Sequence, residues 1–282
     1  MLRFLALMLA TIAVSGAISG CSGKDQPEAP GSPAASASAA PDGTQTAQSA
    51  PKGMVRQADG TLKVSEENDV YSFEYSYPGA AGSIPELSAV LDRRMSAVRE
   101  AHIAMAIDGR ADADANKYPF NPYAYTTKWE VVADLPGWLS LSAEHWEFTG
   151  GAHGNSSFDT LLWDKQAKEV RMPVSLFSSA KELEAAVQPE LCDLLDKQRA
   201  EKRGEKVVRD QGNWMNACIG LQSATVILGS SNRRTFDRIG FLIPPYEAGP
   251  YVEGSYEVTL TVSRAILATV KPEFRGSFSA VR

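Results

Sequence analysis

The spacing of apolar side chains divides the start of the folded chain into a strand and a helix. Residues 69–77 alternate between aromatic and mostly polar side chains, a two-residue period that predicts a strand with one aromatic face. Residues 85–107 carry apolar side chains three or four positions apart, which predicts an amphipathic helix. Ser83 and Glu86 have the spacing of a capping box and are expected to begin this helix. The polar residues 108–121 are expected to form a loop.

Four alternating segments then predict a β-meander. Residues 123–133 and 138–148 read as two strands joined by a short turn. Residues 155–163 return as a third strand after a glycine-rich turn, and residues 169–172 are expected to add a fourth. Strands joined by turns this short pair antiparallel.

The C-terminal half begins with a second predicted helix. Ser179 and Glu182 again have the spacing of a capping box. Pro189 is expected to kink or split this helix because proline has no N–H to donate. The charged run 197–206 is expected to be its solvated end. Strands are predicted at 226–228, 234–243 and 256–262, followed by a short helix at 263–270.

This order of elements predicts the α+β fold class, with an antiparallel β-sheet, two main helices packed on it and a short C-terminal helix. The expected organisation is a signal peptide at 1–20, a disordered lipidated tether at 21–62, a first α+β subdomain at 63–165 and a second at 166–282. The tether is assigned because its Ala, Ser, Pro and Gly residues show no apolar period and bury too little surface to fold.

The first residues have the form of an export signal. Residues 4–18 are apolar but too few to span a bilayer. Ile18-Ser19-Gly20-Cys21 resembles a bacterial lipobox, which implies a diacylglyceryl group on Cys21 and cleavage before it. An ordinary secretory signal with a chance cysteine is the alternative. Ser22, in place of Asp after the cysteine, resembles the sorting signal of outer-membrane lipoproteins. The chain is therefore expected in the cell envelope, lipid-anchored in the outer membrane and facing the periplasm.

Charge and motifs exclude several classes of function. The chain has 28 Lys and Arg against 34 Asp and Glu, a net charge of −6, which disfavours nucleic acid as a partner. It contains no G-x-G-x-x-G or phosphate-binding loop motif, and no cofactor is expected.

Two cysteines remain once Cys21 carries lipid. Cys192 and Cys218 are expected to form a disulfide, because export places them in an oxidising compartment and one pair allows one connectivity. Two buried free thiols are the alternative.

The segment Trp146–Asn155 contains the most informative turn of the chain. Gly150, Gly151 and Gly154 permit unusual backbone conformations around His153. We expect His153 to hydrogen-bond the turn backbone and to fix its shape. A metal site built from His145, Glu147 and His153 is the alternative, but zinc signatures have tighter spacing, so no metal is expected.

Aromatic residues later in the chain are candidates for a ligand surface. Trp214, Tyr246 and Tyr251 are grouped with His153 as ligand-binding candidates, since tyrosine and tryptophan combine an apolar ring with a polar edge. A core position is the alternative for each ring. No G-x-S-x-G motif is present, and no catalytic residue is assigned.

Two motifs resemble one bacterial family. Residues 147–154 (EFTGGAHG) and 244–254 (PPYEAGPYVEG) look like the signature of an extracytoplasmic domain pair of unassigned biochemical function. The pair occurs in the lysozyme-binding region of RsiV-type anti-sigma factors, and a related first half precedes the catalytic domain of PdaC-type peptidoglycan deacetylases. The resemblance covers residues 65–270.

The resemblance implies a ligand rather than a reaction. The sequence has neither the sigma-binding segment and spanning helix of the anti-sigma factors nor the Asp and paired-His motif of the deacetylases, so neither activity is expected. The resulting hypothesis is a membrane-anchored envelope lipoprotein with a non-catalytic domain that binds a peptidoglycan fragment or a lysozyme-like enzyme. A cell-wall-directed hydrolase with His153 in its site is the alternative.

Overall fold

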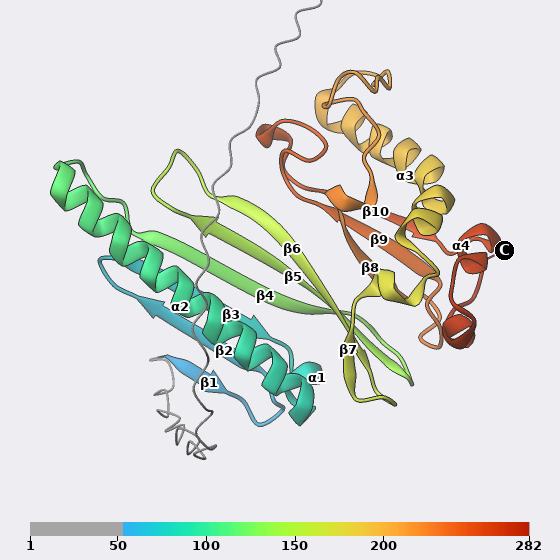
Figure 1. The fold of residues 1–282 in the computed structure, drawn as a ribbon, viewed down its shortest axis with the longest axis horizontal. Coiled ribbons are helices and arrows are strands. Elements are labelled where there is room, and N and C mark those ends of the chain that lie inside the picture. The colour runs from blue at the N-terminus through green and yellow to red at the C-terminus, as the bar shows by residue number, and fades with distance from the viewer. Residues whose placement is uncertain (1–52, 282) are drawn as a thin grey trace, which may run out of the picture. The chain divides into compact units, whose positions relative to one another are not determined.

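The computed structural model describes residues 53–281, which form two β-sheets and the helices packed on them (Figure 1). The predicted signal peptide, Cys21 and most of the predicted tether lie outside these residues. The first sheet holds β1 (Met54–Arg56), β2 (Leu62–Glu67), β3 (Tyr71–Tyr77), β4 (Tyr123–Asp134), β5 (Trp138–Phe148), β6 (Asn155–Asp164) and β7 (Glu169–Arg171) in chain order. The second holds β8 (Thr225–Gly229), β9 (Arg238–Ile243) and β10 (Tyr256–Thr261). The helices are α1 (Gly79–Gly82), α2 (Pro85–Asn116), α3 (Ala180–Arg203) and α4 (Arg264–Ala268).

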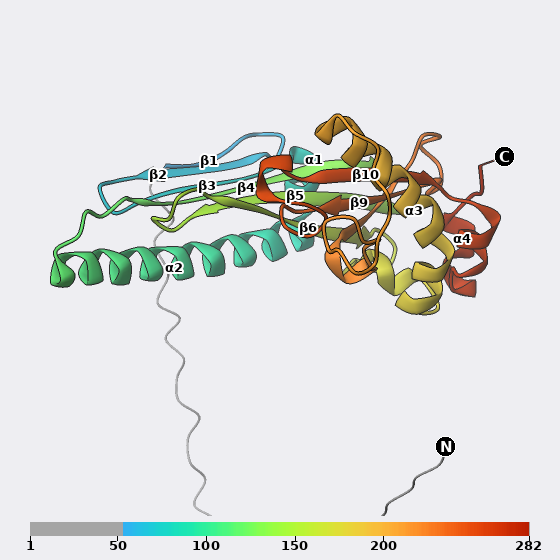
Figure 2. The same cartoon turned by 90° about the horizontal axis from the view of Figure 1, so that it is seen from above.

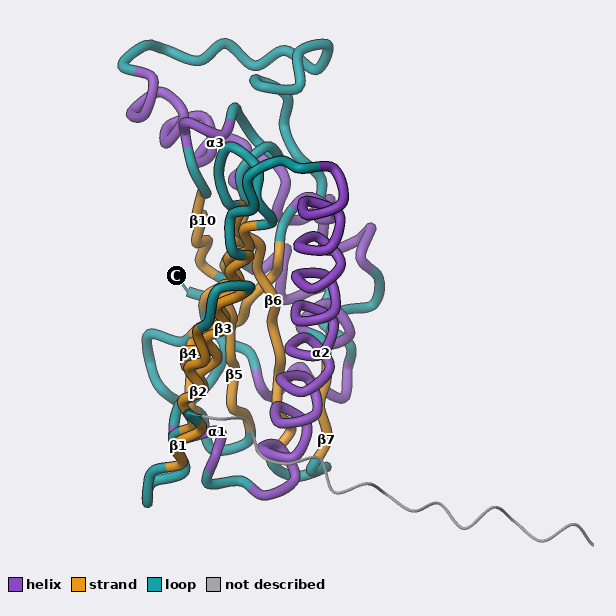
Figure 3. The backbone as a smooth tube through the Cα atoms, turned by 90° about the vertical axis from the view of Figure 1, so that its left-hand side faces the viewer, coloured by secondary structure: helices purple, strands orange, loops and turns teal. Residues whose placement is uncertain are grey.

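The α+β class is confirmed, but the first sheet is not wholly antiparallel. β3 and β4 are parallel, with Tyr71 opposite Tyr123, whereas the other neighbouring strands pair antiparallel. Parallel neighbours need a long crossover connection, and α2 provides it. The helix lies along one face of the first sheet (Figures 2 and 3).

The helix α2 is longer than the apolar stripe predicts. It continues through the predicted loop 108–121 as far as Asn116, and Lys117 ends it in the left-handed conformation, with φ 58°. Alanine-rich sequence with polar pairs four residues apart, such as Arg110 with Asp114, supports these turns without an apolar face. The predicted cap is also wrong: the N-cap is Ile84, and Ser83 ends α1 instead.

The second helix begins as predicted and continues where it was expected to break. The Ser179 hydroxyl accepts from the Glu182 amide at 3.1 Å. Pro189 lies inside a continuous α3, so the expected split is wrong. Val187 and Leu191, on either side of it, are both buried against the second sheet, and this packing outweighs the hydrogen bond that proline removes.

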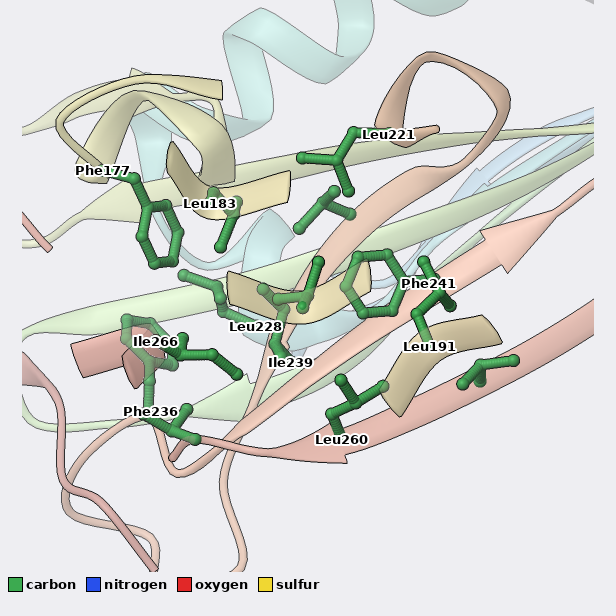
Figure 4. Close-up of a cluster of buried hydrophobic side chains, with 14 of the residues drawn as sticks. Phe177, Leu183, Leu191, Leu221, Leu228, Phe236, Ile239, Phe241, Leu260 and Ile266 are labelled. Carbon is green, nitrogen blue, oxygen red and sulfur yellow. The ribbon is translucent and has the colours of Figure 1, made fainter. Parts of the chain in front are cut away.

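Each sheet has its own buried core. Under α2, Leu87, Leu91 and Met95 pack against aromatic side chains of β3 and aliphatic side chains of β5. Under α3, the helix stripe packs on the second sheet together with Phe177, Phe236 and Ile266 (Figure 4). Burying one large apolar side chain contributes about 1.5–3 kcal/mol, so these two interfaces supply much of the stability.

Two predicted boundaries differ from the structure. β1 lies inside the predicted tether, with Met54 opposite Val64, so the tether cannot extend to residue 62. The strand was missed because its three residues are too few to show a period. β7 pairs with β6, with Val170 opposite Trp163, so the first sheet extends past the boundary expected at 165.

The disulfide predicted between Cys192 and Cys218 is present. Their Cα atoms are 5.4 Å apart, within the range that a disulfide requires. Cys192 is buried on α3, and the bond therefore ties the segment 205–220 back onto that helix.

We expect a digest of the oxidised protein to show the Cys192 and Cys218 peptides linked, by mass spectrometry without reductant. Replacing both residues by serine should lower the free energy of unfolding by about 3 kcal/mol, since the bond closes a loop of 26 residues. Chemical denaturation of the two proteins measures this difference. Equal stability, or free alkylatable thiols in protein taken from the envelope, would contradict the assignment.

Candidate functional site

The two family-like motifs meet in space although about ninety residues separate them. His153 lies in the turn between β5 and β6, and Tyr246 and Tyr251 lie in the segment that joins β9 to β10. The His153 ring stacks on Tyr251 with centroids 3.7 Å apart and an interplanar angle of 17°, and Tyr246 lies 6.5 Å away at 28°. We call these three residues the aromatic cluster.

Hydrogen bonds to one carbonyl hold the aromatic cluster together. His153 Nδ1 lies 2.9 Å from the Gly154 carbonyl oxygen, and the Tyr251 hydroxyl donates to the same oxygen at 2.8 Å. Because a carbonyl only accepts, the ring proton of His153 is on Nδ1, and its Nε2 accepts from the Tyr246 hydroxyl at 3.4 Å. His153 therefore makes the contact with the turn backbone that the sequence predicts.

Two of the turn glycines are required by this geometry. Gly150 has φ 84°, a conformation that side chains disfavour. At Gly154 an added Cβ would overlap the ring of Trp146, so only glycine lets the turn lie flat on that ring. The contact of Gly154 with Trp146 and the contact of His153 with the Gly154 carbonyl thus both constrain the shape of the turn.

Trp146 extends the aromatic cluster along β5. Its ring stacks on Phe148, with centroids 6.3 Å apart and an interplanar angle of 12°. Trp146 is an exposed large side chain, and it contacts Gly154 directly beside the cluster. We call Trp146, Phe148 and the aromatic cluster together the aromatic surface. Trp146 and Phe148 are two positions apart in the predicted strand 138–148, so the sequence predicts that both rings share one strand face. The sequence does not show that this face reaches the second motif.

The end of α3 fixes the second motif. Arg203 donates to both carboxylate oxygens of Glu253, at 2.7 and 3.0 Å, and the Tyr256 hydroxyl bonds the same carboxylate. Burial alone would raise the pKa of Glu253, but these hydrogen bonds outweigh it and hold the pKa below its usual value. The carboxylate therefore stays charged and anchors the motif at neutral pH.

Two further cations of α3 bind backbone carbonyls of the same segment. Lys202 donates to the carbonyls of Glu253 and Ser255, at 2.6 Å each, and the fully buried Arg199 donates to that of Ala248 at 2.8 Å. The expected solvated end of the helix is therefore wrong at Arg199, whereas Lys202 is exposed as expected while its ammonium group binds the two carbonyls. Its partners lie about fifty residues further along the chain, beyond the reach of any local pattern.

The anchored segment presents Tyr246 in an unusual conformation. Its φ is 73°, which is uncommon for a residue with a bulky side chain, and 49% of the residue is exposed. Strained residues of this kind concentrate at binding sites, where the surrounding structure holds them. Tyr246 is therefore displayed to solvent by a backbone held in place by α3.

Trp214 does not join the aromatic cluster. It is 52% exposed, and within residues 53–281 no hydrogen bond or ring contact links it to His153, Tyr246 or Tyr251. Its segment is connected to the site through Arg203, which donates to Asn216 and to the Met215 carbonyl.

The histidines considered for a metal have different surroundings. His145 Nδ1 contacts the hydroxyls of Thr127 and Tyr125, at 2.8 and 3.2 Å, on the α2 side of the first sheet. His153 instead contacts Tyr251. In the described part of the chain no three His, Cys, Asp or Glu residues are arranged to hold a metal ion.

Comparison with known proteins supports the family resemblance. Residues 64–156 match the family described as deacetylase PdaC. A solved DUF3298 family protein from Bacteroides fragilis is similar over 77% of this chain and 95% of its own, with 14% identity and a TM-score of 0.50. Another from Pseudomonas aeruginosa is similar over 79% of this chain and 97% of its own, with 16% identity and a TM-score of 0.48. No curated protein matches significantly.

The match to the PdaC family therefore runs from β2 to just beyond the His153 turn. The described chain shares its fold with the Bacteroides DUF3298 family protein. Between residues 53 and 281, none of the helices combines the length and the apolar character needed to cross a bilayer.

We expect His153→Ala to lower the free energy of unfolding by about 0.5–1.5 kcal/mol, because it removes the bond to Gly154 and the stack on Tyr251. His153→Asn keeps a donor and an acceptor and should recover part of the loss. Thermal melts of the two variants beside the wild type measure this. An unchanged melting temperature for His153→Ala would show that the ring does not shape the turn.

Proposed function

We propose that this protein is a membrane-anchored envelope lipoprotein whose domain binds a cell-wall or protein ligand without catalysis. The ligand classes are a peptidoglycan fragment and a lysozyme-like enzyme, and the proposed site is the aromatic surface. One observation carries the proposal: the two motifs of the family resemblance come together in a single exposed aromatic cluster.

The chemistry of this surface suits recognition. Aromatic rings offer flat apolar faces to sugar rings or to side chains of a protein, and their hydroxyls and ring nitrogens offer hydrogen bonds at the edge. Tyr246 and Tyr251 belong to a segment held by Arg199, Lys202 and Arg203, so little conformational entropy is lost when a ligand binds. A rigid aromatic patch of this kind is typical of binding hot spots.

The hydrogen bonds of His153 support binding rather than hydrolysis as the function of this site. Its two ring nitrogens are engaged with the Gly154 carbonyl and the Tyr246 hydroxyl, which leaves the ring holding the turn. The PdaC family carries the name of a deacetylase, and for this chain we propose that the related domain contributes ligand recognition alone.

The proposed location follows from the N-terminal sequence. The lipobox-like Ile18-Ser19-Gly20-Cys21 places the lipid on Cys21, and the polar residues after it would hold the domain away from the membrane. Such an anchor would keep the aromatic surface in the periplasm, beside the wall.

We expect Tyr246→Ala to weaken ligand binding by about tenfold or more, as for an aromatic hot spot. Tyr118→Ala is the matched control, because Tyr118 is 48% exposed but lies just after α2. Sedimentation with purified peptidoglycan and calorimetry with lysozyme test the two ligand classes separately. Equal loss in both variants, or binding to neither ligand, would contradict the proposal.

The same preparations distinguish binding from hydrolysis. Incubation of the protein with peptidoglycan should release no soluble fragments. Release that disappears in His153→Ala, while its melting temperature stays unchanged, would instead support the hydrolase.

Replacing Cys21 by serine should move the protein from the membrane fraction to the soluble fraction, since the acyl chains are the proposed anchor. Fractionation of cells that produce each form, followed by immunoblotting, measures this. A variant that stays with the membranes would show that another part of the chain anchors it.

A further inference from the structure

A second candidate site lies on the other face of the first sheet. A pocket of about 370 Å³, open to solvent on one side, lies between α2 and the strands β3 to β6. His145 lines it, whereas its neighbour Trp146 belongs to the aromatic surface. Successive side chains of a strand point to opposite faces, so the pocket and the aromatic surface are separated by the sheet. The pocket is lined by Tyr75, Arg94, Ala97, Val98, Tyr125, Trp129, His145 and Asp159.

The inner walls of the pocket are rigid and aromatic. Tyr75 and Trp129 are almost fully buried, and the Trp129 indole N–H donates to the Tyr75 hydroxyl at 2.8 Å. The Arg94 guanidinium lies 5.7 Å from the Trp129 ring centre. These contacts fix the side chains before any ligand arrives, which is the arrangement that small-molecule sites use.

The charges at the pocket balance each other. Arg94 Nη1 lies 2.6 Å from Asp159 Oδ2, and both side chains are about one-third exposed, at 37% and 34%. The pair therefore reaches solvent. An anion would be opposed by Asp159 and a cation by Arg94, whereas the paired groups keep spare donors and acceptors for a neutral polar ligand. The pair favours a neutral ligand that both donates and accepts hydrogen bonds.

His145 adds a neutral polar group. The hydroxyls of Thr127 and Tyr125 lie 2.8 and 3.2 Å from its Nδ1, and because a hydroxyl both donates and accepts, either ring tautomer satisfies these contacts. Burial lowers the pKa of His145, although Asp159 acts in the opposite direction, so the ring is uncharged at neutral pH. Within residues 53–281 no hydrogen bond engages Nε2, which leaves this ring nitrogen for a ligand.

We propose that this pocket binds one neutral sugar ring, through hydrogen bonds to Asp159, Arg94 and His145 and apolar contact with Tyr125 and Trp129. A pyranose suits these walls because it carries hydroxyls that donate and accept around an apolar ring face. The volume is at the lower end of the roughly 300–1,000 Å³ of small-molecule sites, which fits a single ring rather than a chain. The site shares no residue with the aromatic surface and does not depend on the function proposed for it.

The test is saturation-transfer NMR on the full-length protein with a panel of neutral monosaccharides, including glucose, galactose and N-acetylglucosamine, at millimolar concentrations. Ala97→Leu should weaken the binding by about tenfold or more, because the larger side chain fills the pocket without changing its polar groups. Ala111→Leu, at an exposed position near the end of the same helix, is the matched control and should bind like the wild type. Asp159→Asn should also weaken binding, and thermal melts confirm that each variant is folded.

The outcomes separate this site from the aromatic surface. Tyr246→Ala should leave the monosaccharide signal unchanged, even where it abolishes binding to peptidoglycan or lysozyme. Absence of a signal for every neutral sugar would overturn the proposal, as would a signal that survives Ala97→Leu. A signal lost in Tyr246→Ala but not in Ala97→Leu would assign sugar binding to the aromatic surface instead.

Discussion

The ion pair between Arg203 and Glu253 determines where the second motif lies, and the aromatic cluster depends on it. Glu253 ends the short helical turn that carries Tyr251, and the Tyr251 hydroxyl in turn reaches the Gly154 carbonyl of the first sheet. Moving an unpaired carboxylate out of water costs free energy. The bidentate hydrogen bonds from Arg203 and the hydrogen bond from the Tyr256 hydroxyl offset this cost for Glu253 and keep it charged. This ion pair at the end of α3 thereby supports the contact between the second motif and the β5–β6 hairpin.

The two faces of the first sheet carry side chains of different character. One face carries Trp146 and Phe148 toward solvent, and it is suited to a large flat partner. The other holds His145 and Asp159 beneath α2, where they line a small pocket that opens to solvent. The alternation of side chains along β5 is enough to produce this division, because neighbouring residues of one strand serve opposite faces. Recognition at one face therefore need not disturb the other.

Local patterns predicted the elements whose partners are near in sequence. The strands 123–133, 138–148 and 155–163 follow one another through short turns, and the contact of His153 with its own turn lies one residue away. The burial of Arg199 near the basic end of α3 was missed because its partner is a backbone carbonyl of a distant segment, and no local sequence pattern indicates such a partner. The pocket was missed for the same reason: Arg94 and Asp159 are sixty-five residues apart and meet only when α2 crosses the sheet.

The parallel pairing of β3 with β4 has a consequence for how the chain reaches its native state. The strands β1 to β3 form one locally connected antiparallel unit and β4 to β7 another, and each can pair through short turns. Joining them requires closure of the long connection between β3 and β4, most of which is occupied by α2. Contacts this distant in sequence slow folding, since loop closure must precede the gain from packing. The pairing of β3 with β4 is therefore the one in the first sheet that closes the longest loop and carries the largest entropic cost.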